Sequence, residues 1–193
     1  MGLAERQRLL ARLATDAGLR DRFADDPAAA TAELGLSPDD AGWLAALSSG
    51  PLALFAGSLI AKRRGEVAKL LPGTARALGP ARFSERFRRH ASDRPIPGGP
   101  RKHRDDALGF AATIGRDAGD PPWVADLARL EAGALRAHDP ARRLAAVGLG
   151  HHPADLALAL DSGVLPGRRP TLILWVRPRR GGRLRRLVVA RPW

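Results

Sequence analysis

The feature that most constrains the fold lies near the end of the chain, where two apolar runs in residues 171–193 flank a glycine pair. The runs are rich in the β-branched and aromatic residues that are enriched in strands. Between them, residues 178–182 include Gly181 and Gly182, which can adopt the positive φ angles that a tight hairpin turn needs. We therefore expect the last part of the chain to form a β-hairpin.

This segment is also strongly basic, because it contains arginines and neither aspartate nor glutamate. The charge is compatible with a surface that attracts anions, or with an exposed sheet edge that binds a partner. A third reading is a solvated face whose arginines prevent strands of neighbouring molecules from pairing. The arginines stand at positions 177, 179, 180, 183, 185, 186 and 191.

The whole chain of 193 residues has a formal net charge of +12, which suggests attraction to nucleic acid, anionic lipid or an acidic protein. Only three of the 32 basic residues are lysine, and arginine and alanine are abundant throughout, so the charge reflects a general compositional bias. Tyrosine is absent and other aromatic residues are few, so the stacking platforms of single-strand binders are missing. Nucleic-acid binding is therefore the less favoured expectation.

Cysteine is absent, which excludes disulfides, thiolate metal sites and cysteine nucleophiles. The first residues are charged and helix-patterned, without the apolar run of a secretory signal, so we expect a cytoplasmic protein. The longest apolar patch, residues 51–61, is followed by Lys62 and is too short to span a bilayer. We interpret it as a buried helix and expect no membrane association.

Helical periodicity dominates residues 1–137. Ser37 followed by Pro38 predicts a helix start, because a serine side chain accepts hydrogen bonds from free N–H groups and proline suits the first turn. Proline and glycine mark the expected breaks, at residues 25–27, 35, 71–73, 79–80 and 92–100.

The pattern changes after the helices, where residues 143–149 resemble a strand and residues 153–160 a helix before the terminal hairpin. The fold class predicted is α+β, with a mainly helical N-terminal part, a small α+β C-terminal part and a boundary around residues 138–142. We divide the chain into a helical extension (1–50), a helical domain (51–140) and a small α+β domain (141–193).

Candidates for chemistry are few. His151, His152 and Asp155 form the best metal-like cluster, but at most two of them converge locally, whereas a zinc site needs three or four ligands. We favour a strand-to-helix turn at His152 with Pro153 at the first helical position. Glu131 has no tuned titratable partner in the sequence, so a salt bridge or a helix-capping role is expected for it.

One series of residues is informative when taken together: Lys62, Arg63, Glu66, Val67, Leu71, Pro72, Leu78, Gly79, Phe83, Phe87, Asp106, Ala107, Phe110, the run 123–131, His152, Pro153, Leu174 and Trp175. This series resembles the helical domain of the partner proteins of multinuclear non-haem iron-dependent oxidases, proteins once labelled putative DNA-binding domains. The likeness extends loosely over residues 50–190 and is closest to the variant fused behind an oxidase in actinobacteria. Residues 1–50 lie outside it, and Lys62-Arg63 stands where the family usually has Tyr-Arg.

This resemblance implies a non-catalytic accessory protein, without a metal or cofactor of its own, that binds an iron-dependent oxidase and helps present a ribosomal precursor peptide. The alternative is a basic DNA-binding protein. An edge strand of the hairpin could bind the peptide by adding a strand, and arginines along it could attract an acidic leader sequence. The residues expected to contact the partner or peptide are Trp175, Arg177, Arg183, Arg185, Arg186 and Val188.

Overall fold

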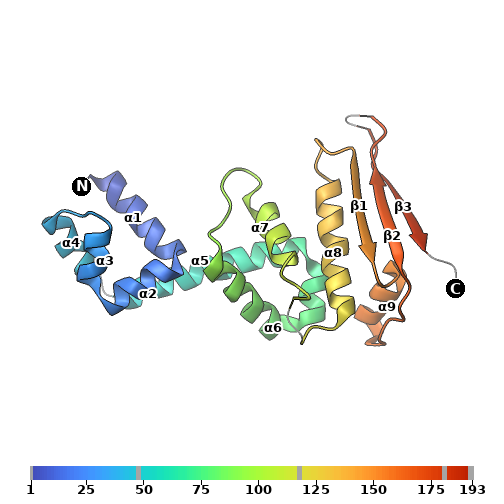
Figure 1. Ribbon diagram of the computed structural model, residues 1–193, viewed down its shortest axis with the longest axis horizontal. Helices are drawn as coiled ribbons and strands as arrows, with labels where there is room; N and C mark the ends of the chain where they lie inside the picture. Colours follow the sequence, from blue (N-terminus) through green and yellow to red (C-terminus); the bar gives the residue numbers. More distant parts are fainter. Residues whose placement is uncertain (1, 47–48, 117–118, 180–181, 191–193) are drawn as a thin grey trace. The chain divides into compact units, whose positions relative to one another are not determined.

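The computed structural model describes residues 2–46, 49–116, 119–179 and 182–190 (Figure 1). Within these ranges the chain forms nine helices and a three-stranded sheet at the C-terminal end, which confirms the α+β class. The residues cluster into two compact units. The first comprises residues 1–65 with 87–96 and the second comprises 66–86 with 97–193, so each unit is described by itself.

The first unit has a core of leucine, phenylalanine and tryptophan side chains from short N-terminal helices. These helices are α1 (Leu3–Thr15), α2 (Ala17–Asp25), α3 (Pro27–Glu33) and α4 (Pro38–Ala45). The expected cap is confirmed, because the Ser37 hydroxyl accepts from the Asp40 N–H at the start of α4. The buried core consists of Leu9, Leu13, Leu19, Phe23, Ala30 and Leu44.

Residues 51–61 lie in the long helix α5 (Ser49–Leu70), as expected for a helix, but the prediction that this helix is buried is wrong. Leu54 is 77% exposed and Phe55 is 53% exposed, while Ala56 is buried. An apolar run alone does not fix burial, since apolar side chains make up much of any protein surface. None of the helices that the structure describes is long and apolar enough to cross a membrane.

The helices of the second unit are held together by polar caps as well as by apolar packing. Helix α6 (Pro72–Asp93) is kinked at Gly79, where φ is +72°, in agreement with the break expected at residues 79–80. The carboxylate of Glu131 accepts from the N–H groups of Gly73 and Thr74, at 2.7 and 3.0 Å. This arrangement caps the start of α6 and confirms the capping role expected for Glu131.

The sheet consists of β1 (Leu144–Leu149), β2 (Thr171–Val176) and β3 (Arg185–Ala190), all antiparallel, in the order β1-β2-β3. Helix α9 (Pro153–Ser162) connects β1 to β2. The predicted terminal hairpin is confirmed by the pairing of β2 with β3. In its turn the Gly182 N–H donates to the Arg179 carbonyl at 2.9 Å, whereas Arg180 and Gly181 lie outside the described residues.

One face of the sheet packs on α8 (Pro122–Ala137), and α7 (Lys102–Ala111) packs against the same helix (Figure 1). The contact with β2 is close, because a Cβ placed on Gly133 would lie 2.9 Å from the ring of Trp175. Glycine is therefore required at position 133 for the helix to approach the tryptophan. This core contains Leu127, Ala137, Leu149, Leu156, Ile173 and Trp175.

Candidate functional site

Strand β3 lies at the edge of the sheet. One side of its backbone forms hydrogen bonds with β2, and the other side faces away from the sheet. The Arg177 N–H donates to the Arg143 carbonyl at 2.8 Å, in the same register as the β1–β2 ladder. Hydrogen-bonded pairs alternate along antiparallel strands. Arg177 and every second residue of β2 before it therefore face β1, and the residues between them face β3. The β3 partners of these intervening residues, whose N–H groups face β2, are Arg185, Leu187 and Val189.

The intervening β3 residues direct their N–H and C=O groups away from β2. These residues are Arg186, Val188 and Ala190, which pair in register with Trp175, Ile173 and Thr171 without exchanging hydrogen bonds. Val188 is 42% exposed. The expected sheet edge is therefore present, with the backbone of Val188 near its centre, while its use as a docking edge stays a prediction.

The outer face of the sheet, away from α8, is apolar on all three strands. Register places on this face Leu144 and Ala146 of β1, Leu172 and Leu174 of β2, and Leu187 and Val189 of β3. We call these six residues the outer apolar face. Leu144 of β1 is 60% exposed, Leu172 of β2 43%, and Leu187 and Val189 of β3 53% and 57%, so exposed apolar groups lie on all three strands. Contiguous patches of this kind mark interaction sites in soluble proteins.

This outer apolar face was missed in the sequence reading. Its signal is visible in β2, where residues at both alternate sets of positions in the segment TLILWV are apolar. A strand with one solvated face usually alternates apolar and polar side chains, so an unbroken apolar run indicates covering on both sides. Among the described residues, α8 covers one face of the sheet and no helix packs on the other face.

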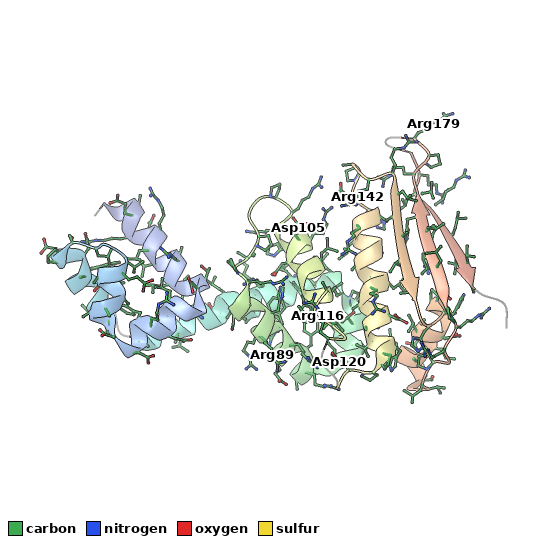
Figure 2. All side chains as sticks on the ribbon, in the orientation of Figure 1. Arg89, Asp105, Arg116, Asp120, Arg142 and Arg179 are labelled. Atoms are coloured by element: carbon green, nitrogen blue, oxygen red, sulfur yellow. The ribbon has the colours of Figure 1, made fainter. Side chains whose placement is uncertain are left out.

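The exposed arginines expected at the site lie on different faces of the sheet or next to the hairpin turn. Arg183 precedes β3 and is exposed, and Arg185 and Arg186 are exposed on β3. Since consecutive strand residues point to opposite faces, Arg185 lies on the outer face beside Val176, whereas Arg186 lies on the α8 side across from Trp175. Figure 2 shows Arg179 at the turn end of the hairpin. A basic rim thus borders the outer apolar face at the turn end.

Trp175 was expected among the partner-contacting residues, but it is only 4% exposed and packs against α8 at Gly133. Its partner in the fold is therefore the helix, and an incoming protein cannot reach its ring without displacing α8. The sequence pattern could not reveal this, because Trp175 and its neighbours Leu174 and Val176 are all apolar.

Arg177 was also expected at the site, and it too is buried. Its guanidinium donates to the carbonyl oxygens of Asp139 at 3.0 Å, Arg142 at 3.2 Å and Ala137 at 3.5 Å. These carbonyls belong to the end of α8 and the segment that follows, where a cation also complements the helix dipole. Arg177 ties the end of β2 to the end of α8.

Asp139 joins the same region to the start of α7. Its carboxylate accepts from the Ala141 N–H at 3.1 Å, from Arg104 at 3.1 Å and from Arg101 at 2.7 Å. The hydrogen bond from Ala141, followed by the contacts with Arg104 and Arg101, holds the pKa of Asp139 below its ordinary value, although burial opposes this shift. The carboxylate of Asp139 is therefore protonated at lower pH in the folded protein than a free aspartate is.

The histidines after β1 have structural partners. The His152 side chain accepts from the Ala154 N–H at 3.2 Å and caps α9, with Pro153 at its first position, which confirms the strand-to-helix turn. His151 Nδ1 lies 2.7 Å from the carboxylate of Asp126, which is buried on α8. Among the described residues, no group of three or more acidic or histidine side chains could hold a metal ion.

The Asp126 contact joins residues 25 positions apart in the sequence, and no local spacing could have revealed it. The same carboxylate oxygen accepts from the Gly150 N–H at 2.7 Å, so Asp126 positions the turn that follows β1 on the surface of α8. An ionised carboxylate can only accept, so His151 Nδ1 donates and Nε2 is left as the nitrogen for other contacts.

Comparison with known proteins gives one match within the chain. A family model described as SCO6045-like, C-terminal domain, matches residues 47–116. The match includes α5, α6 and α7 and ends before α8 and the sheet. No curated protein matches the chain. The helical middle of the chain is thus similar to the C-terminal domain of the SCO6045-like proteins.

Proposed function

We propose that this chain is a non-catalytic accessory protein that binds an iron-dependent peptide-modifying oxidase and helps it recognise a ribosomal precursor peptide. In this role the oxidase holds the iron, and the accessory protein contributes binding surfaces alone. We place the complex in the cytoplasm. The single observation that carries the proposal is the open edge of β3 beside the outer apolar face.

The edge supports the peptide-binding half of the proposal. An extended peptide could add to β3 as a fourth strand and use the outward groups of Arg186, Val188 and Ala190. Arg185 and Arg183 lie nearby, and residues 171–193 contain no acid that would repel an acidic peptide. Exposed ion pairs are worth about 0–1 kcal/mol each, so backbone pairing would supply most of the affinity and charge would favour orientation and association rate.

The outer apolar face supports the oxidase-binding half. Docking there would remove Leu172, Leu187 and Val189 from water, whose residues are 43%, 53% and 57% exposed. Burial of apolar area contributes about 25 cal/mol per Å² before the cost of association is subtracted. The basic rim at the turn end would favour an oxidase surface with an apolar centre and an acidic border. The resemblance of residues 50–190 to oxidase partner proteins points in the same direction.

The peptide edge can be tested by a substitution that removes one backbone donor. In Val188→Pro the lost N–H faces away from β2, so the hairpin ladder should persist, as edge strands tolerate proline. We expect near-normal circular dichroism and about tenfold weaker binding of the precursor peptide, since one hydrogen bond is worth about 1 kcal/mol and the ring also obstructs pairing. Isothermal titration calorimetry with the peptide encoded beside the gene would measure the change.

The matched control is Val188→Ala, which shortens the side chain but keeps the N–H. Its affinity for the peptide should remain within about threefold of the unaltered protein, because the backbone donor is unchanged. Equal affinities for the proline and alanine variants would show that strand addition at β3 does not occur. Leu187→Pro removes a donor to β2 instead, and should disrupt the hairpin itself.

The rival function, a basic DNA-binding protein, is favoured by the net charge of +12. Binding to duplex DNA of arbitrary sequence should then begin below micromolar Kd at low salt and weaken steeply with added salt, because neutralised phosphates release counterions. We expect instead no DNA binding at low salt, together with co-purification of the chain and the oxidase encoded beside it. Tight, salt-sensitive DNA binding without oxidase binding would overturn the proposed function.

A further inference from the structure

A pocket of about 680 Å³ lies in the second unit, and its described lining includes no residue of β3 or of the outer apolar face. It is lined by Gly115, Arg116 and Asp120 from the described parts of the segment between α7 and α8, by the first turns of α8, by the turn after β1, and by Arg168 before β2. Its volume falls in the range of small-ligand sites, about 300–1,000 Å³. The walls bring together three arginines and a histidine from four separate parts of the chain.

The walls are closely packed, which makes the pocket a built feature of the fold. Gly115 has φ of +84°, and a Cβ at this position would lie 2.5 Å from the Cβ of Ala125. Only glycine meets both demands, because other residues rarely adopt this conformation and have no space here. On the other side, the turn after β1 is held by the bonds from Gly150 and His151 to Asp126.

Among the lining residues that the structure describes, two are acidic, Asp120 and Asp126, and the carboxylate of each accepts hydrogen bonds from donors within the protein. Asp126 accepts from Gly150, His151 and Arg129, and its side chain is nearly fully buried. The buried carboxylate of Asp120 accepts from Arg86 at 3.0 Å and more weakly from Arg82. Neither carboxylate would repel an anion strongly, because each is neutralised by these contacts.

The arginines of the lining have fewer contacts with other side chains than the two carboxylates have. Arg116 and Asp120, both labelled in Figure 2, come from the segment between α7 and α8, and Arg116 is exposed. In the part of the chain that the structure describes, neither Arg116 nor Arg168 has an ion-pair partner. Arg129 is 57% exposed although it contacts Asp126. His151 also lines the pocket, with Nδ1 hydrogen-bonded to Asp126 and Nε2 left for contact with a ligand.

We propose that this pocket binds the oxyanion group, phosphate or carboxylate, of a small ligand. Planar guanidinium groups donate in pairs to such oxygens, and Arg116 and Arg168 are the two whose donors are available. Arg129 and His151 border the same space and are positioned by Asp126. Binding in this pocket does not require the β3 edge to bind a peptide. The pocket can therefore be tested on the isolated chain, without oxidase or peptide.

The test is a titration of the purified chain with inorganic phosphate, and separately with succinate, at constant ionic strength maintained with sodium chloride. A ligand that binds only the folded state raises the thermal midpoint with its concentration. We expect one of the two probes to raise it above the chloride baseline, and the stronger probe identifies the ligand as a phosphate or a carboxylate. In Arg116→Gln/Arg168→Gln, the affinity for that probe should fall at least tenfold.

The matched control is Arg142→Gln, which removes an exposed arginine from the opposite end of β1 and should leave the affinity unchanged. An equal response in the double variant would show general charge screening and overturn the proposal. So would the absence of a response to both probes. The ring signals of His151 in nuclear magnetic resonance spectra of the unaltered protein supply a second readout, and they should shift during the titration whether or not the double variant folds.

Discussion

The two faces of the C-terminal sheet have similar apolar side chains but different surroundings. On the inner face, Ile173 and Trp175 are almost completely buried against α8, with glycine at position 133 to admit the tryptophan ring. On the outer face, Leu187 and Val189 remain more than half exposed. The inner face stabilises the fold of the chain itself, whereas the outer face offers apolar area that the described part of the chain leaves exposed. Substitutions on the two faces should therefore separate folding from binding.

The largest effect is expected for Trp175→Ala on the inner face. The substitution leaves a cavity between α8 and β2, and removal of a buried tryptophan costs about 3–5 kcal/mol in the free energy of unfolding. Urea denaturation followed by circular dichroism would measure the loss. A loss below about 1 kcal/mol would show that the inner face is not the main core of this unit.

A smaller effect is expected for Arg177→Ala, with Arg185→Ala as its matched control. The buried guanidinium of Arg177 serves three carbonyl groups, so its removal should cost about 2–3 kcal/mol in the free energy of unfolding. Arg185 is exposed on the outer face, and its removal should cost less than about 0.5 kcal/mol. Arg185→Ala should instead reduce the salt dependence of peptide binding. Equal losses of stability would contradict the division between the two faces.

The stabilisation that the contacts of Asp139 provide next to Arg177 should also depend on pH. Its pKa is lower in the folded protein than the ordinary value of about 3.9, so its contribution to stability is complete above that value. The contribution is lost as the pH falls through the lower folded pKa. The difference in unfolding free energy between the unaltered protein and Asp139→Asn should therefore be largest near neutral pH and should shrink in strong acid. A constant difference across this range would exclude an ionised Asp139 as the cause.

The smallest effect on stability is expected for Leu187→Gln on the outer apolar face. Because Leu187 is exposed, the free energy of unfolding should change by no more than about 0.5 kcal/mol. Oxidase binding, measured by calorimetry, should nevertheless weaken about tenfold if this face forms the centre of the interface. Unchanged oxidase binding, with an intact fold, would move the interface away from the outer apolar face.

The sequence was sufficient to predict those elements whose determinants are local. The glycine pair after Arg180 predicted the hairpin, Ser37 predicted a helix start, and the His152-Pro153 pair predicted a strand-to-helix turn. Each depends on residues a few positions apart. The capping role of Glu131 was also anticipated, as one of two alternatives, although its partners Gly73 and Thr74 lie 58 and 57 positions away.

Contacts between distant elements could not be predicted in the same way. The burial of Trp175 and Arg177 depends on where α8 lies, and the apolar pattern of β2 is the same on either face. The exposure of Leu54 and Phe55 in α5 has the same origin, because an apolar run does not specify what covers it. The pairing of His151 with Asp126 joins two elements, so it required the fold.

Pairing with β3 would also give the side chains of a bound peptide two alternating environments. Neighbouring residues of such a strand would point to opposite sides of the sheet, and positions two apart, about 6.8 Å along the strand, would share one environment. Residues on one side would meet the surroundings of Arg186 and Val188, and those on the other side the surroundings of Leu187 and Val189. Tolerance to substitution along the peptide would accordingly alternate from one residue to the next, so recognition would depend on a spaced pattern of side chains more than on a continuous motif.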